Sequence, residues 1–115
     1  MIDVHNEGMA ITDNVVETIV ALAVKEIDDV ASIGTPSANL IHQVFRNAPT
    51  DPGIEVHTND KNQLEISLHL GVRYGKPLPD IAEEVRTAVS DAITVQLGME
   101  VARVDIFVDS IRFSD

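Results

Sequence analysis

Hydrophobic residues recur every three or four positions near the start of the chain, in the stretch DNVVETIVALAVKEI. This spacing places them along one side of an α-helix and predicts a helix from about residue 13 to about residue 28. Thr12 is the expected N-cap, and Asp13 in the first turn meets the positive end of the helix dipole. The apolar positions of this helix are Val15, Val16, Ile19, Val20, Ala23 and Ile27.

The segment after this helix carries shorter patterns. The stretch VASI is expected to be a short extended piece, which Gly34 and Pro36 end. Helical spacing returns in SANLIHQVFR and predicts a second, short helix over residues 37–46. The stretch NAPTDPG contains two prolines and a glycine within a few residues, so we expect a loop there.

Over residues 54–74 the hydrophobic period changes to two. Apolar and polar side chains alternate on both sides of the turn-forming stretch TNDKNQ, which predicts a β-hairpin with one buried face. Pairing Val56 with Ile66 keeps the apolar residues of both strands on the same side. In this register His57 lies opposite Glu65.

The stretch VRYGKPLPDIAEEVRTAV leads from the second hairpin strand into another helix. Pro79 suits the first turn of that helix, where its missing N–H has no intrahelical partner, and Gly98 is expected to end it. The stripe facing the core is Ile81, Val85, Ala88, Val89, Ala92, Ile93 and Leu97. A last strand is predicted over residues 101–108, and the right-handed crossover rule places it parallel to a hairpin strand.

These elements predict an α+β fold, a two-layer sandwich with helices packed on one face of a small mixed sheet. The sheet consists of the hairpin plus the parallel crossover strand. At 115 residues the chain is expected to be a single domain, residues 1–115, with one core. Hydrophobic residues make up 44% of the sequence and aromatic residues only 3%, so we expect an aliphatic core.

The chain is strongly acidic, with 19 acidic and eight basic residues and a formal net charge of −11. Such a charge repels phosphate backbones and anionic lipid headgroups, so we expect no nucleic-acid partner and no direct membrane insertion. No apolar run approaches the roughly 20 residues that span a bilayer, and the N-terminus lacks the features of a secretory signal, which predicts a cytoplasmic protein. The absence of cysteine excludes disulfides, thiolate catalysis and thiolate metal sites.

Three stretches carry a family likeness in their order and spacing. They are ITDNVVETIVALAVKEIDDVASI, VRYGKPLPDIAEEVRTAV and LGMEVARVDIFV, and the likeness extends from about residue 9 to residue 109. Together they resemble the alkaline shock protein and general stress protein family of bacterial envelope stress response proteins. The chain differs from many members of that family in lacking a glycine-rich run within GTPSANLIHQVFRNAPTDPG.

This resemblance implies a non-enzymatic cytoplasmic protein that supports cell-envelope homeostasis. Such a protein self-associates into homo-oligomers, docks on a membrane-anchored protein partner, or does both. Association with the membrane is then expected only through that partner. The resemblance supplies no catalytic residues and no cofactor.

The polar face of the 54–74 hairpin gives the alternative hypothesis, a small metal- or ligand-binding protein. His57, Glu65 and His69 are expected on this face, where imidazole and carboxylate groups could converge on a metal ion. An alternating strand also presents polar groups to water without any metal. A catalytic triad from Ser67, His69 and Glu65 is disfavoured because these side chains project side by side from one strand, without evident oxyanion donors.

The last residues, DSIRFSD, alternate again after a change of phase at Asp109 and Ser110. Ile111 and Phe113 take the apolar positions of this tail. The pattern leaves two outcomes open: the tail pairs with another chain, or both residues pack on their own core. Ile111 and Phe113 are therefore the candidate interaction residues.

Overall fold

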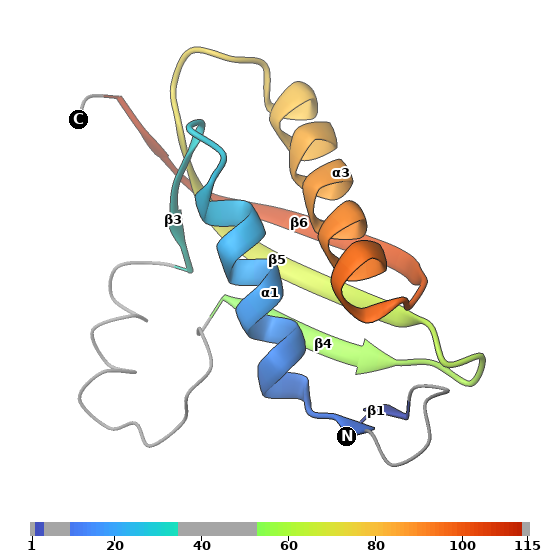
Figure 1. Ribbon diagram of the computed structural model, residues 1–115. Helices are drawn as coiled ribbons and strands as arrows, with labels where there is room; N and C mark the ends of the chain where they lie inside the picture. Colours follow the sequence, from blue (N-terminus) through green and yellow to red (C-terminus); the bar gives the residue numbers. More distant parts are fainter. Residues whose placement is uncertain (1, 4–9, 35–52, 114–115) are drawn as a thin grey trace, which may run out of the picture.

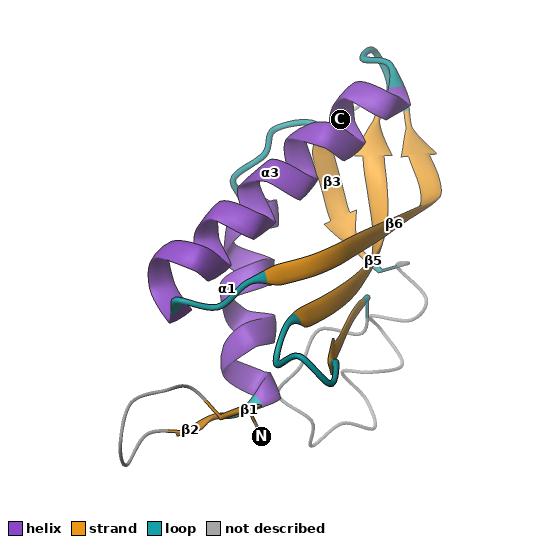
Figure 2. Ribbon diagram, turned by 90° about the vertical axis from the view of Figure 1, so that its right-hand side faces the viewer, coloured by secondary structure: helices purple, strands orange, loops and turns teal. Residues whose placement is uncertain are grey.

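The structure is a computed structural model that describes residues 2–3, 10–34 and 53–113. Figures 1 and 2 show two helices lying on one face of a sheet, which confirms the predicted α+β two-layer fold. In chain order the elements are β1 (Ile2–Asp3), β2 (Ala10–Ile11), α1 (Asp13–Lys25), β3 (Val30–Ile33), β4 (Ile54–Thr58), β5 (Leu64–Arg73), α3 (Leu78–Leu97) and β6 (Val101–Arg112). β1 and β2 pair with each other as a small separate ribbon.

The main sheet is organised around β5. β6 runs parallel to β5 along the whole of one edge, which confirms the predicted parallel crossover. β4 and β3 are both antiparallel to β5 and share its other edge, with β4 against the first half of β5 and β3 against the second half. The predicted hairpin register is also confirmed, because Val56 pairs with Ile66 and His57 with Glu65.

The change from β4 to β3 along this edge takes place at His69. The backbone N–H of His69 donates to the Gly53 carbonyl at 2.8 Å, and its carbonyl accepts the Gly34 N–H at 2.6 Å. A Cβ at Gly53 would lie 2.5 Å from the Gly34 nitrogen and 2.8 Å from the His69 carbonyl oxygen. Glycine at position 53 therefore lets the end of β3 and the start of β4 meet on one β5 residue.

α1 begins where the sequence predicts, with Thr12 as its N-cap residue. It ends at Lys25, before the predicted end near residue 28. Asp28 and Asp29 explain the earlier end, because carboxylates are unfavourable at the negative end of a helix dipole. The chain instead turns after α1 and enters β3, the strand that the stretch VASI predicts. The short helix predicted over residues 37–46 lies outside the described residues.

α3 follows the predicted pattern closely. Pro77 is the N-cap residue, and Pro79 lies in the first turn. Gly98 ends the helix in the left-handed conformation, with φ of 68°, and its N–H donates to the Thr94 carbonyl at 3.0 Å. The buried residues of α3 are four members of the predicted stripe, Ile81, Val85, Val89 and Ile93.

The core lies between the helices and the sheet. Alternate residues of β5 point into it and are almost completely buried: Leu64, Ile66, Leu68, Leu70 and Val72. Burial of one such side chain stabilises the fold by roughly 1.5–3 kcal/mol. Within the described residues no polar or charged side chain is buried, so this core is aliphatic, as the composition predicts.

The junction at His69 gives a testable prediction. Gly53→Ala should destabilise the fold by about 1–3 kcal/mol, because the new methyl group meets backbone atoms that cannot move away without breaking strand hydrogen bonds. Gly71→Ala is the matched control, because a Cβ there meets the side-chain oxygens of Ser32 and Ser110, which can rotate. Urea unfolding of both variants measures the difference. An equal loss in the two variants would contradict the proposed role of Gly53.

Candidate functional site

The face of the sheet opposite the helices carries the polar residues singled out in the sequence. His57 of β4 and Glu65 of β5 lie opposite each other in the hairpin register. Ser67 and then His69 follow Glu65 along the same face of β5. β6 adds its own alternating set to this face, because Arg103 pairs with Glu65 and the next odd-numbered residues follow in register. The sequence therefore placed these side chains on the correct face.

The polar side chains of this face pair with one another across β5 and β6. A guanidinium nitrogen of Arg103 lies 3.6 Å from the Glu65 carboxylate, and its Nε lies 2.9 Å from the Asp105 carboxylate. His69 Nδ1 lies 3.0 Å from Asp109 Oδ2. The His69 ring also stacks on Phe107, with ring centres 4.7 Å apart and planes inclined by 14°.

This arrangement does not assemble a metal site. Glu65 forms an ion pair with Arg103, whereas His69 contacts Asp109 and stacks on Phe107. The three candidates His57, Glu65 and His69 therefore do not converge on one point. In the described part of the chain, no group of three or more His, Asp or Glu side chains is placed to hold a metal ion. The metal- or ligand-binding alternative therefore gains no support from the geometry of this face.

The tail continues as strand beyond the predicted end of β6 at residue 108, and β6 reaches Arg112. Its register against β5 shifts between Val108 and Ser110, which is where the sequence changes phase. After the shift Ile111 pairs with Val72, whose side chain lies on the helix side of the sheet. Ile111 nevertheless remains 41% exposed and Phe113 76% exposed, so neither is buried in the described core.

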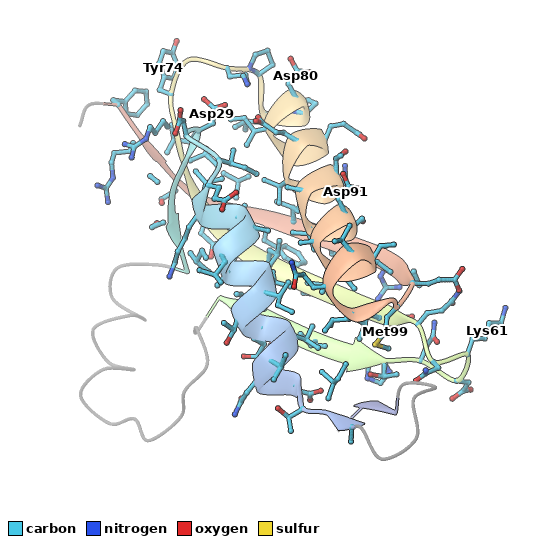
Figure 3. All side chains as sticks on the ribbon, in the orientation of Figure 1. Asp29, Lys61, Tyr74, Asp80, Asp91 and Met99 are labelled. Carbon is cyan, nitrogen blue, oxygen red and sulfur yellow. The ribbon has the colours of Figure 1, made fainter. Side chains whose placement is uncertain are left out.

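Tyr74 belongs to the same end of the molecule. The alternation of β5 predicts it on the buried face, but it is 71% exposed because α3 begins farther along, at Leu78, and leaves this end of the sheet uncovered. Its ring packs on Phe113 with ring centres 5.1 Å apart. Figure 3 shows Tyr74 at the tip of the molecule, beyond the start of α3. A hollow of about 440 Å³ beside it is lined by Arg73, Tyr74, Gly75, Lys76, Pro77, Leu78 and Ile111.

β6 is also an edge strand. One of its edges is bonded to β5, and among the described residues no strand covers the other edge. From the helical layer, Arg86 Nε of α3 donates a 3.3 Å hydrogen bond to the Val104 carbonyl of this strand. We use "β6 surface" for the uncovered edge of β6 together with the exposed apolar residues Phe107, Val108 and Ile111 of this strand and Phe113 directly after it.

Lys76 lines the hollow and forms ion pairs with the turn that follows α1 and with α3. Its Nζ lies 2.8 Å from Asp29 Oδ2, in the turn before β3, and 3.3 Å from Glu84 Oε1 on α3. The hydrogen bonds to Asp29 and Glu84, with the attraction of both carboxylates, raise the pKa of Lys76 above its ordinary value of 10.5. This cation is therefore held in place by its neighbours and is not a candidate general base.

Parts of this surface were not predicted from the sequence. The contacts of His69 with Phe107 and Asp109, and of Arg86 with Val104, join residues from different elements. The sequence feature that could have indicated this face of β6 is the alternation of Arg103, Asp105 and Phe107 with apolar residues. The alternation alone does not determine which β5 residue lies opposite each of these side chains.

The fold and the surface together define a class of protein: a small α+β domain whose exposed features are an edge strand and an apolar tip. The model of the alkaline shock protein 23 family, described as having a cell envelope-related function, matches residues 2–113. The chain belongs to this family, which confirms the resemblance carried by its three stretches. No helix in the described residues is long and apolar enough to cross a membrane.

Two curated relatives extend the comparison. The stress response regulator gls24 homolog of Streptococcus pyogenes is 26% identical over 101 residues, which cover 87% of this chain. This chain spans only 56% of the length of that relative. The uncharacterised protein YloU of Bacillus subtilis is 25% identical over 93 residues, or 77% of each chain. The description of the first relative names a stress response and no chemical reaction.

A solved structure gives a likeness of fold. MamM-CTD carrying one histidine-to-alanine substitution superposes with a TM-score of 0.51 at 10% sequence identity. The match covers 86% of this chain and 98% of the other. At this identity the match shows the arrangement of helices and strands alone.

The ion pairs of Lys76 predict a dependence of stability on pH. Because the pKa of Lys76 is higher in the folded state than its ordinary value, the stabilisation is fully present below pH 10.5 and is lost as the pH rises through the folded-state pKa. Lys76→Gln should therefore unfold at less urea than the native chain near neutral pH, and this difference should shrink above pH 10.5.

Urea midpoints over a series of pH values measure this difference. Lys61→Gln is the control, because Lys61 is an exposed lysine in the turn between β4 and β5. A difference between native and Lys76→Gln that stays constant through the alkaline range would show that the ion pairs do not carry the effect.

Proposed function

We propose that this chain is a non-enzymatic domain of the cell-envelope stress response that acts by binding other protein chains through its β6 surface. The family supports the envelope-related part of this proposal. The proposed partners are copies of the same chain in a homo-oligomer, a membrane-anchored protein, or both. The whole chain, residues 1–115, is taken as the interacting unit.

The observation that carries the proposal is the long edge of β6, which no described strand covers, with three exposed apolar residues in the strand and a fourth, Phe113, directly after it. Phe107 is 48% exposed, Val108 37%, Ile111 41% and Phe113 76%. Single exposed apolar residues are common on proteins, but apolar residues gathered in one place, as Tyr74, Ile111 and Phe113 are at the tip, are typical of an interaction site. An open strand edge can in addition accept the backbone hydrogen bonds of an incoming strand.

The charge of the chain supports a protein partner over a lipid or nucleic-acid surface. A formal net charge of −11 is repelled by anionic lipid headgroups and by phosphate backbones. We propose that the protein is cytoplasmic and reaches the membrane only through a membrane-anchored partner. Neither a cofactor nor a catalytic centre is part of the proposed function.

The proposal predicts that the tip of the β6 surface is needed for binding. The double variant Ile111→Ser with Phe113→Ser should retain the fold, because both side chains are exposed, and should lose most of its partner proteins. Capture from a bacterial lysate with its membrane fraction, by immobilised native and variant chains, measures this loss. Val95→Ser is the matched control, because Val95 is an apolar residue of α3 that is 78% exposed.

Circular dichroism checks that each variant keeps its secondary structure. If the double variant captures the same proteins in the same amounts as the native chain and Val95→Ser, binding does not use the tip. A loss that Val95→Ser shares would equally contradict the proposal, because it would not depend on the β6 surface.

A further inference from the structure

The side chains of β6 form a pattern that complements itself. On the open face the order along the strand is Arg103, Asp105, Phe107 and Asp109, so a cation stands at one end and a carboxylate at the other. The residues between them, Val104, Ile106 and Val108, project toward the helix side and are apolar. Reversing the direction of such a strand therefore sets its basic end against the acidic end of another copy.

Three registers about the middle of β6, with the two-fold axis at Asp105, Ile106 or Phe107, can be compared directly. Residues that lie opposite each other in an antiparallel pair point to the same face, so a symmetric pairing has its two-fold axis at one residue. With the axis at Asp105, two Asp105 carboxylates face each other. With the axis at Phe107, Asp105 faces the partner's Asp109 twice. Like charges in directly opposite positions are destabilising, and an acidic chain has the least tolerance for them.

The axis at Ile106 avoids both conflicts. Arg103 then faces the partner's Asp109, and Asp109 faces the partner's Arg103. Asp105 faces the partner's Phe107, and Val104 faces the partner's Val108 on the other side of the sheet. The Arg103–Asp109 pairs thus match opposite charges on the open face and the Val104–Val108 pairs match apolar residues on the helix side, which is the pairing that stabilises neighbouring strands.

We propose that the occupant of the β6 edge is the β6 strand of a second copy of this chain, paired antiparallel about Ile106. This inference rests on the proposed function, because it names the partner of the β6 surface. The two sheets join into one continuous sheet, and the two-fold axis keeps both helical layers on the same side. The uncovered edge, the exposed Phe107 and Val108, and the charge order of the strand are explained together.

Contacts within one copy are compatible with this pairing. Arg103 already contacts Glu65 and Asp105, but a guanidinium has five N–H donors and can also reach a carboxylate of the partner. Asp109 uses one oxygen for His69 and retains the other. The Arg86 contact with the Val104 carbonyl, at 3.3 Å, is long for a hydrogen bond, and an incoming strand would replace it.

Cysteine pairing tests the register, since the native sequence contains no cysteine. Asp105→Cys and Phe107→Cys chains, mixed in a glutathione redox buffer, should form a disulfide-linked heterodimer, because opposite Cα atoms in an antiparallel pair are about 4.5–5.5 Å apart and a disulfide spans this range. Each variant alone should form little dimer. Non-reducing electrophoresis of the three samples reads the result. Preferential 105–105 or 107–107 dimers would overturn the axis at Ile106.

Charge reversal tests the interaction itself. Arg103→Asp and Asp109→Arg should each weaken dimerisation about tenfold or more, because each places two like-charged pairs in the interface. The double variant should restore it toward the native value. Asp91→Arg is the control for Asp109→Arg, since it makes the same change in net charge at an exposed position of α3. Sedimentation equilibrium measures the dissociation constants.

Three results separate this inference from the proposed function. A native chain that remains monomeric, while Ile111→Ser with Phe113→Ser still loses captured proteins, would overturn the self-pairing and leave the proposed function standing. A dimer with the 105–107 disulfide, rescued by the double charge variant, would support the self-pairing even if lysate capture is unchanged. A dimer whose dissociation constant is unchanged by every β6 substitution would overturn the self-pairing.

Discussion

The strand β5 is bonded along both edges and buried on one face, and the rest of the structure depends on this. Its alternate residues from Leu64 to Val72 fill the core, while Glu65 and His69 lie on the open face. A slip of one residue would turn these polar groups into the core, where unpaired polar groups are costly. The choice of which β5 side chains enter the core is therefore strongly fixed. β3, β4 and β6 all pair with β5, so their registers are defined against it.

Because both edges of β5 are bonded, β6 forms one outer edge of the sheet, and the two halves of that strand differ. In the first half Arg86 occupies the Val104 carbonyl, and Arg103 and Asp105 place paired charges beside it. Charged side chains on an edge are a common protection against unwanted strand pairing. The second half has Phe107, Val108 and Ile111 exposed instead. A strand protected at one end and apolar at the other is suited to selective pairing.

The sequence was sufficient for features that depend on one element and its immediate neighbour. The hairpin register followed from matching Val56 with Ile66, because only an apolar match keeps one face buried. Contacts between distant residues could not be derived in this way. His69 and Asp109 are 40 positions apart, and their meeting depends on the register of β6 against β5, which alternation fixes only to within two residues.

The same limit applies to the hydrogen bonds by which Gly34 and Gly53 both pair with the backbone of His69. Each glycine predicts a break in the chain, but neither identifies the backbone atoms that come close to it. The candidate site shows both outcomes. The face of His57, Glu65 and His69 was predicted correctly from the period of two, whereas their separation into different pairs depended on Arg103, Phe107 and Asp109 of β6.

One extra residue in β6 produces the apolar tip. Before the register shift, the odd-numbered residues of β6 lie on the open face, where Phe107 meets His69. After it, Ser110 pairs with Gly71 and Ile111 with Val72, so the odd-numbered residues move to the helix side. Without this bulge Ser110 would lie opposite Val72, the position beside the hollow that Ile111 takes. The bulge thus delivers Ile111 to an end of the sheet that α3 leaves uncovered, which makes an apolar surface there a consequence of strand geometry.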